Sequence, residues 1–234
     1  MSGNRDGPEF PPAATRLVLF DLDGTLVHSL PDLALSIDQM LVELGMPERG
    51  EAAVSTWLGD GIDALVERAL LDGLGVEPDA VLLARAMPLF KQRYAANNGV
   101  LSRPYPGARL LLDVLRAAAL RLGCVTNKSQ AFTHPLLQQL GLHACFDCVV
   151  CGDEVRHKKP HPEPLLEACG QMGVPITDTL FVGDSRNDVQ AARAAGMPIV
   201  CVSYGYNQGD DIRSAGADAV VDDLNEVAAL LGFS

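Results

Sequence analysis

Two aspartates that stand two residues apart, Asp21 and Asp23, follow the apolar run Leu17–Phe20 near the start of the chain. Residues two apart in extended backbone point to the same side, so both carboxylates can face one pocket. Two carboxylates in different surroundings can take different roles, because one can act as a nucleophile while the other acts as a general acid and base. The pair is therefore a candidate catalytic centre.

Two other interpretations of this segment are a simple turn and a calcium-binding loop. Asp23 and Gly24 form a common turn pair, so the segment can be a simple turn. A calcium-binding loop counted from Asp21 would have Gly at its sixth position and Glu at its twelfth, whereas this chain has Leu26 and Asp32 there. The calcium loop is the weaker alternative.

A further acidic segment begins at Asp184, directly after an apolar run and Gly183. Asp21, Asp184 and a backbone carbonyl would form an oxygen-only site of the kind that Mg²⁺ prefers. Ser185 with Asp188 three residues later is a capping-box pattern before an apolar helical run. A cap and a pocket carboxylate are compatible, so we expect Asp188 to lie behind the residues that contact the metal.

Two polar segments offer groups that could hold an anion. Thr126 ends an apolar run and is followed by Asn127 and the start of a helical pattern, which supplies a hydroxyl and backbone amides; simple helix capping by Ser129 is the alternative. Lys158 and Lys159 are neighbours and point to opposite sides of an extended loop. Because Lys159 precedes a proline, which favours extended backbone, we expect it to point inward and Lys158 to be solvated.

Short apolar runs alternate with segments of helical periodicity along most of the chain, which predicts an α/β fold with a doubly wound, Rossmann-like parallel sheet. In such a sheet, ligands bind beyond the carboxyl ends of the strands, where the polar segments above begin. The predicted strands are Leu17–Phe20, Leu122–Thr126, Cys148–Cys151, Thr179–Val182, Ile199–Val202 and Ala219–Val221.

About a hundred residues separate the first two predicted strands, far more than a crossover needs, and they show helical patterns only. We therefore expect an all-helical domain over residues 29–100, inserted into a core formed by residues 16–28 and 101–234, after a disordered tail over residues 1–15. Gly59 and Gly61 in the insertion would let backbone approach a small ligand closely. Arg68 or Lys91 could supply a cation there.

The amino-acid composition of the chain argues against several functional classes. The 234 residues include 18 basic and 30 acidic ones, a net charge of −12, which disfavours binding to nucleic acid or to an anionic membrane. No apolar stretch reaches the roughly 18 residues of a membrane span. Six cysteines, four of them in apolar runs, indicate a reducing compartment, so we expect the cytoplasm.

The motifs Asp21-Leu22-Asp23-Gly24-Thr25, Thr126, Lys159-Pro160 and Gly183–Asp188 resemble, in order and spacing, those of the haloacid dehalogenase-like phosphohydrolases, in the subgroup with a helical cap. The resemblance implies that Asp21 is the nucleophile and a metal ligand, that Asp23 is the acid/base and binds Mg²⁺ through its carbonyl, and that Asp184 completes the metal site. It implies that Thr126 and Lys159 hold the phosphoryl oxygens. Substrate contacts are expected at Gly24, Thr25, Thr126, Asn127, Lys159, Gly59 and Gly61.

Within that family, Trp57–Gly61, Tyr105–Gly107 and Tyr204–Asn207 are similar to segments of bacterial phosphoglycolate phosphatases. This implies a Mg²⁺-dependent phosphatase that hydrolyses a small phosphomonoester, 2-phosphoglycolate, through an aspartyl-phosphate. Another small substrate, such as an amino-sugar phosphate, a hexose phosphate or pyrophosphate, is the alternative within this class. A phosphoacceptor signalling domain is the alternative from another class. The sequence does not distinguish a monomer from a homodimer.

Overall fold

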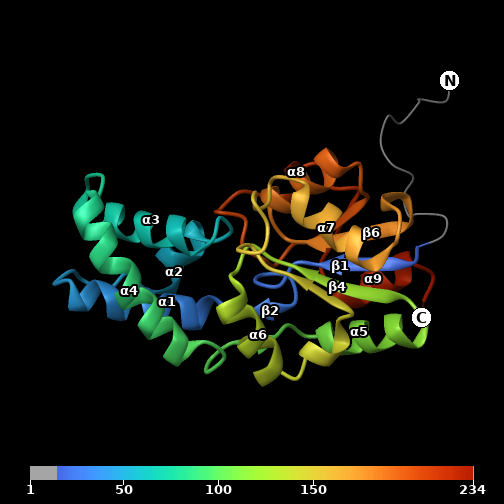
Figure 1. The fold of residues 1–234 in the computed structure, drawn as a ribbon, viewed down its shortest axis with the longest axis horizontal. Helices are drawn as coiled ribbons and strands as arrows, with labels where there is room; N and C mark the ends of the chain where they lie inside the picture. Colours follow the sequence, from blue (N-terminus) through green and yellow to red (C-terminus); the bar gives the residue numbers. More distant parts are fainter. Residues whose placement is uncertain (1–14, 234) are drawn as a thin grey trace.

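The computed structural model describes residues 15–233, so the tail predicted over residues 1–15 lies outside the described residues except for Thr15. The fold consists of a sheet-based core and a group of helices beside it (Figure 1). Six parallel strands form the sheet in the order β5-β4-β1-β6-β7-β8. They are β1 (Leu17–Phe20), β4 (Arg121–Val125), β5 (Cys148–Val150), β6 (Thr179–Gly183), β7 (Ile199–Val202) and β8 (Ala219–Val221).

The order of the strands reverses between β1 and β6, since the chain first adds β4 and β5 on one side of β1 and then β6 to β8 on the other. The predicted doubly wound parallel sheet is therefore confirmed. A ligand-binding crevice is expected where the order reverses, at the carboxyl ends of β1 and β6.

Helices cover both faces of the sheet because consecutive side chains of the central strands, which point to opposite faces, are apolar. Val18 and Phe20 pack on one face with α5 (Ala108–Ala117), α6 (Gln130–Gln139) and α9 (Leu224–Leu230). Leu17 and Leu19 pack on the other face with α7 (Glu163–Met172) and α8 (Arg186–Ala195). Short 3₁₀ turns complete the core at His143–Cys145, Ile176–Asp178 and Ile212–Ser214.

The predicted helical insertion between β1 and β4 is also confirmed. It consists of α1 (Leu30–Glu43), α2 (Gly50–Val54), a 3₁₀ turn over Ser55–Trp57, α3 (Ile62–Leu74) and α4 (Ala80–Asn97). These helices, called the cap below, have an apolar core of their own, to which α1, α3 and α4 contribute most. The cap lies beside the carboxyl ends of the central strands (Figure 1).

The base of the cap contains a feature that the sequence patterns did not predict. Two short strands, β2 (Val27–His28) and β3 (Arg103–Pro104), pair antiparallel where the chain leaves the core and returns to it. Next to them, the buried Asp32 carboxylate accepts hydrogen bonds of 2.8–2.9 Å from the backbone amides of Gly99, Leu101 and Ser102. The carboxylate of Asp32, at the start of the cap, thus holds the segment through which the chain returns to the core.

The described residues contain no membrane-spanning helix and no disulfide bond. Within residues 15–233, no helix combines the length and the apolar character that a membrane crossing requires. All six cysteines lie buried with free thiols.

Candidate active site

A cleft with an empty volume of about 570 Å³ opens between the carboxyl ends of the central strands and the cap. Core residues that line it follow β1, β4, β6 and β7, and cap residues that line it come from α1, α3 and the loop before α3. The cleft therefore lies where the reversal of strand order predicts a ligand site. Its polar side is lined by Asp21, Asp23, Thr126, Asn127, Lys128, Asp184 and Ser185.

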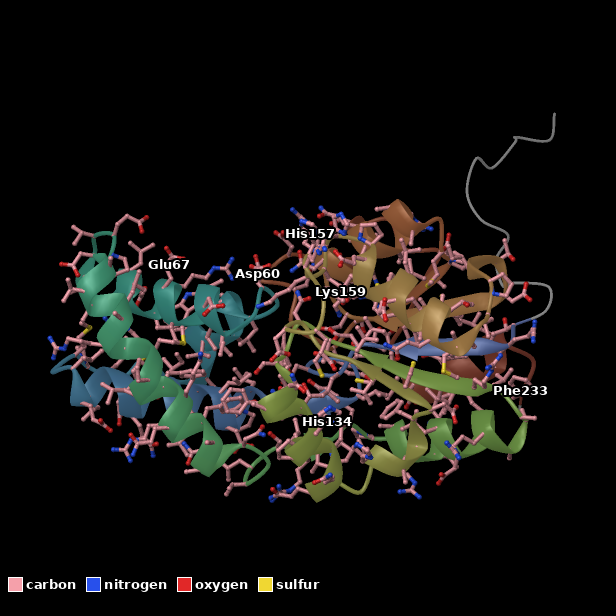
Figure 2. The ribbon with its side chains drawn as sticks, viewed as in Figure 1. Asp60, Glu67, His134, His157, Lys159 and Phe233 are labelled. Carbon is pink, nitrogen blue, oxygen red and sulfur yellow. The ribbon has the colours of Figure 1, made fainter. Side chains whose placement is uncertain are left out.

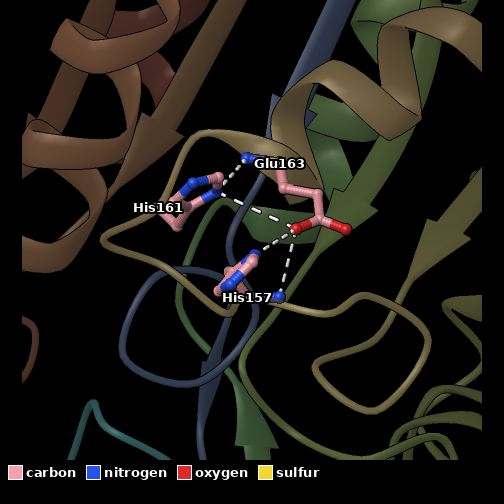
Figure 3. A group of neighbouring side chains, drawn as sticks. All are labelled: His157, His161 and Glu163. Carbon is pink, nitrogen blue, oxygen red and sulfur yellow. Dashed lines mark hydrogen bonds and ion pairs between the residues drawn. The ribbon is translucent and has the colours of Figure 1, made fainter.

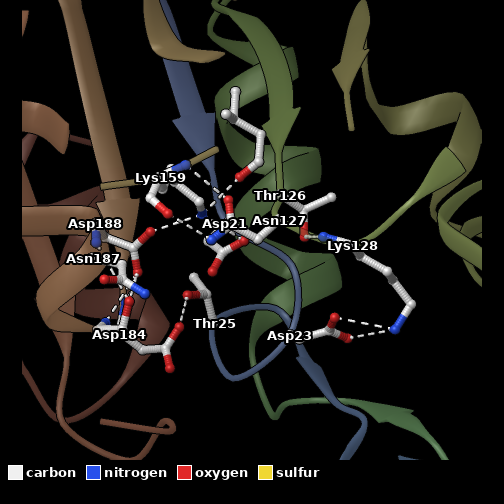
Figure 4. A network of polar contacts seen from close by, with 12 residues as sticks. Asp21, Asp23, Thr25, Thr126, Asn127, Lys128, Lys159, Asp184, Asn187 and Asp188 are labelled. Carbon is white, nitrogen blue, oxygen red and sulfur yellow. Dashed lines mark hydrogen bonds and ion pairs between the residues drawn. The ribbon is translucent and has the colours of Figure 1, made fainter. Parts of the chain in front are cut away.

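Lys159 lies between two carboxylates at the bottom of this site (Figure 4). Its Nζ is 2.8 Å from Asp21 Oδ1 and 2.8 Å from Asp188 Oδ1, and the side chain is 2% exposed. Burial raises the pKa of the Asp21 carboxyl to about 7, although the Lys159 ammonium opposes this and Asp188 adds to it. Burial alone would lower the pKa of Lys159, but the two carboxylates raise it above its usual value. The lysine therefore stays charged.

Asp188 forms the cap that the sequence pattern predicted, and it also contacts Lys159. Its Oδ2 accepts hydrogen bonds from the backbone amides of Asp184 and Ser185, and the capping box with Ser185 is formed at the start of α8. Its Oδ1 contacts Lys159. Asp188 thus fixes the ammonium that Asp21 faces, and it holds the backbone that positions Asp184.

Asp184 directly follows β6 and is 2% exposed. One of its oxygens accepts a hydrogen bond of 2.6 Å from Thr25 Oγ1, and the other accepts one of 2.6 Å from the backbone amide of Tyr206. Gly24 and Gly205 leave the space that this carboxylate occupies, because a Cβ at either position would overlap Asp184. Burial, together with Asp188 and Asp21, raises the pKa of Asp184 well above its usual value.

Oxygens of Asp21, Asp184 and Asp188 lie within 4.8 Å of one another. The donor set consists of carboxylate oxygens, which suit a hard divalent cation. Asp21 Oδ1 is buried and faces Lys159 as an ion pair, but the described residues give it no donor with hydrogen-bond geometry. This cluster therefore fits a divalent cation.

Asp23 points toward a different lysine (Figure 4). Its carboxylate oxygens lie 3.2 and 3.1 Å from Lys128 Nζ, which also donates to the hydroxyl of Tyr94 on α4. Lys128 is buried in spite of its charge, since its side chain is 3% exposed. The sequence patterns did not indicate a function for this lysine. Its position directly after Thr126 and Asn127 at a strand end was the available signal.

Asn127 fixes the loop that carries Lys159. Its amide group donates to the carbonyl of Lys159 at 2.9 Å and accepts from the Lys159 amide at 2.9 Å. It also donates to the carbonyl of Gly59 in the cap at 2.9 Å. Thr126, which is 3% exposed, lines the cleft beside it.

The cap loop at residues 59–61 reaches the core through polar contacts. Gly59 and Gly61 line the cleft with φ values of 113° and 90°, which a residue with a side chain rarely adopts. Asp60, which lies where the cap meets the core (Figure 2), accepts hydrogen bonds from Asn187 at 2.6 Å and Gln208 at 2.9 Å. Burial alone would raise the pKa of Asp60, but its hydrogen bonds from Asn187 and Arg68 lower it.

Comparison with known proteins identifies the family. A family model described as haloacid dehalogenase-like hydrolase matches residues 18–202. The chain belongs to the haloacid dehalogenase-like hydrolases. It is 46% identical over 215 residues to a phosphoglycolate phosphatase of Nitrosococcus oceani, which covers 92% of this chain and 96% of the relative. It is 48% identical over 220 residues to one of Nitrosospira multiformis, which covers 94% and 97%.

Solved structures of similar proteins agree with this assignment. A predicted phosphoglycolate phosphatase from Haemophilus somnus is 36% identical and superposes with a TM-score of 0.88, covering 93% of this chain and 98% of that chain. A putative phosphoglycolate phosphatase from Lactobacillus delbrueckii is 25% identical with a TM-score of 0.84, covering 94% and 99%. The fold of this haloacid dehalogenase-like hydrolase, cap included, is therefore shared with solved relatives.

The cap of this hydrolase does not present the cations that the sequence suggested. Arg68 donates to the carbonyl of Trp57 at 2.7 Å and to the Asp60 carboxylate, so its guanidinium is already bound. Lys91 is exposed on α4 and does not line the cleft. Helical periodicity predicted that both residues lie on helices, but it did not predict which face of each helix they occupy. Lys158 is solvated, with its side chain 36% exposed.

A second cluster of titratable groups lies on the surface next to the Lys159 loop (Figure 3). Atoms of His157, His161 and Glu163 lie within 4.8 Å of one another. Glu163 accepts hydrogen bonds of 3.1 Å from the backbone amides of Arg156 and His157, and 2.8 Å separates it from the His157 ring. These bonds close the loop before α7, so the cluster helps to fix the segment that carries Lys159.

Proposed function

We propose that this protein is a Mg²⁺-dependent phosphatase that hydrolyses 2-phosphoglycolate to glycolate and inorganic phosphate. The observation that carries the proposal is the pair of ion pairs at Lys159, which gathers Asp21 and Asp188 beside Asp184 at the bottom of the cleft. The names of relatives that are 46% and 48% identical over nearly their whole length support phosphoglycolate as the substrate.

Asp21 is the proposed nucleophile. An oxygen of its carboxylate bonds to phosphorus while the bond from phosphorus to the glycolate oxygen breaks, and Asp23 donates a proton to that oxygen. Water then attacks phosphorus, Asp23 takes its proton, and the bond to Asp21 breaks. Lys159 and Thr126 hold the phosphoryl oxygens in this scheme, which places positive charge where negative charge develops.

Asp21, Asp184 and the main-chain carbonyl of Asp23 are the proposed ligands of Mg²⁺. A bound Mg²⁺ would offset the repulsion between the carboxylate of Asp21 and the phosphate dianion. Asp188 acts through its contacts with Lys159 and with the backbone at Asp184.

The cap would cover the substrate and exclude bulk water from the cleft, apart from the water molecule that attacks phosphorus. We assign residues 29–100 to this domain and residues 16–28 and 101–234 to the core. The β2–β3 pair at its base, with one strand on each side of the insertion, supports these limits. The six free thiols support the cytoplasm as the expected location.

Release of inorganic phosphate from a panel of small phosphomonoesters, ranked by kcat/KM with Mg²⁺ present, tests the proposal. The panel contains phosphoglycolate, a hexose phosphate, an amino-sugar phosphate and pyrophosphate. Steady multiple turnover separates an enzyme from a phosphoacceptor domain, which would stop after one phosphoryl group. A higher kcat/KM for another ester would overturn phosphoglycolate as the substrate.

Asp21→Asn tests the nucleophile. We expect a loss in kcat of about 10⁴-fold or more, because the amide cannot form the mixed anhydride. Asp63→Asn, at an aspartate whose side chain is 75% exposed, removes the same charge outside the proposed machinery and is the matched control. Turnover at the wild-type rate in Asp21→Asn would end this assignment.

A further inference from the structure

We propose that Lys128 binds the carboxylate of the substrate and thereby selects phosphate esters with a second anionic group. This inference rests on the proposed function and adds the residue that recognises the leaving group. It places that residue in the core, after β4, and not in the cap, where the sequence had suggested Arg68 or Lys91.

The charges around the cleft single out this lysine. The described residues that line the cleft include the carboxylates of Asp21, Asp23 and Asp184 but a single cation, Lys128. A carboxylate that enters without its water needs a cation or several hydrogen-bond donors, because burying an unpaired charge is costly. The cap side of the cleft offers the apolar side chains of Leu33, Leu58, Ile62 and Leu65 and the backbone of Gly59 and Gly61. None of these supplies a positive charge.

The other cations near the site are already committed. Lys159 is held between Asp21 and Asp188 at the phosphoryl end, where it is proposed to bind the phosphoryl oxygens. Arg68 is bound to Asp60 and to a backbone carbonyl. Lys128, in contrast, lies beside Asp23, the proposed acid/base, which must reach the oxygen that joins phosphorus to the leaving group. The carboxylate of phosphoglycolate is two bonds from that oxygen, so Lys128 is at the correct end.

The ammonium of Lys128 is oriented before substrate binds. It carries three N–H donors, and its acceptors in the described structure are the two Asp23 oxygens and the Tyr94 hydroxyl. The two Asp23 distances, 3.2 and 3.1 Å, are nearly equal, as when one N–H is shared between two acceptors. That sharing leaves a donor for a second carboxylate.

Tyr94 is a positioning residue for this lysine. It is fully buried on α4 of the cap, and the Lys128 ammonium lies 4.8 Å from the centre of its ring as well as in contact with its hydroxyl. The cap therefore contributes to leaving-group recognition through a core lysine. Tyr94→Phe removes the hydroxyl and keeps the ring, so it isolates this contribution.

The test compares two esters that differ in one charge. Phosphoglycolate carries the carboxylate, and 2-hydroxyethyl phosphate replaces it with a neutral group of similar size. We expect Lys128→Met to lower the ratio of their kcat/KM values by about 100-fold or more, since a buried charge-assisted contact is lost. Tyr94→Phe should lower the same ratio by a smaller factor. Lys91→Met, which removes an exposed lysine from the same helix as Tyr94, should leave it unchanged.

A positioning effect on Asp23 alone gives a different result. If Lys128 only orients the acid/base, both esters slow equally and the ratio stays at its wild-type value, which overturns the proposal. Because the ratio is internal to each sample, partial misfolding does not alter it. Should turnover become too slow, binding of 3-phosphonopropionate against propylphosphonate gives the same comparison without chemistry. A wild type with no preference for phosphoglycolate would refute the proposed function instead, and the assignment of Lys128 with it.

Discussion

Replacing Lys159 by Met removes the ammonium that lies 2.8 Å from both Asp21 and Asp188. The two carboxylates cannot turn to water in compensation, because their side chains are 13% and 0% exposed. Breaking a buried ion pair by removal of one partner costs about 3–5 kcal/mol of folding free energy. We expect a loss of this size for Lys159→Met, measured by urea denaturation with circular dichroism in the presence of a chelator.

The pH dependence of this loss can be derived from Asp21. Burial raises its pKa from 3.8 to about 7, so between these values the folded protein binds a proton that the unfolded chain has released. Stability therefore falls as pH rises through this window. The Lys159 ammonium lowers the pKa of Asp21, so its removal should raise that pKa further. In the variant, the loss of stability with rising pH should then continue to a higher pH. The difference between variant and wild type should be larger at about pH 8 than at about pH 5.5.

Lys158→Met is the matched control, because it removes the neighbouring lysine of the same loop, whose side chain is 36% exposed. We expect this change to alter the free energy of unfolding by about 0.5 kcal/mol or less, as for most surface substitutions. An equal loss in the two variants, or a loss in Lys159→Met that does not depend on pH, would refute the assignment of Lys159 as the counterion of a buried carboxylate pair.

Three further results are expected. Asp32→Ala should destabilise the protein by about 3 kcal/mol in urea denaturation, because it leaves the buried backbone amides at the base of the cap without an acceptor. Gly205→Ala should weaken Mg²⁺ binding at least about tenfold in calorimetry, since its Cβ displaces Asp184, whereas Gly170→Ala, which meets nothing, should not. Mg²⁺ affinity should fall about tenfold per pH unit below pH 7, because the pKa of about 7 keeps Asp21 protonated there and the proton must leave before the metal binds; an affinity that stays constant down to pH 5 would contradict this.

The core was predictable from sequence because burial leaves a simple signature there. The runs Leu17–Phe20 and Ile199–Val202 coincide with β1 and β7, since strands covered on both faces need apolar residues at every position. The β2–β3 pair could not be found in this way. Strands of two residues have no period, and their pairing depends on where the cap returns to the core.

The contacts between core and cap show a similar limit. Asp21, Asp23 and Asp184 were identified because each follows a strand, and the carboxyl ends of parallel strands must meet at one edge. Lys128 and Tyr94 are 34 residues apart, and their contact depends on how the cap lies over the core. No spacing rule connects a helix of one domain with a loop of another. For the same reason, the sequence could suggest cap cations but could not tell which of them faces the cleft.

Two buried lysines explain how an acidic protein could bind an anionic substrate. A chain with a net charge of −12 places three carboxylates around a cleft that is proposed to accept an anion. Two buried lysines offset this: Lys159 is paired with Asp21 and Asp188, which come from different segments, and Lys128 is paired with Asp23. One lysine lies beside Asp21 and the other beside Asp23. An anion can therefore be attracted at two points of the cleft, although the net charge of the protein repels anions. Such a site favours molecules with two negative groups, because an ester with one anionic group leaves Lys128 without its second partner.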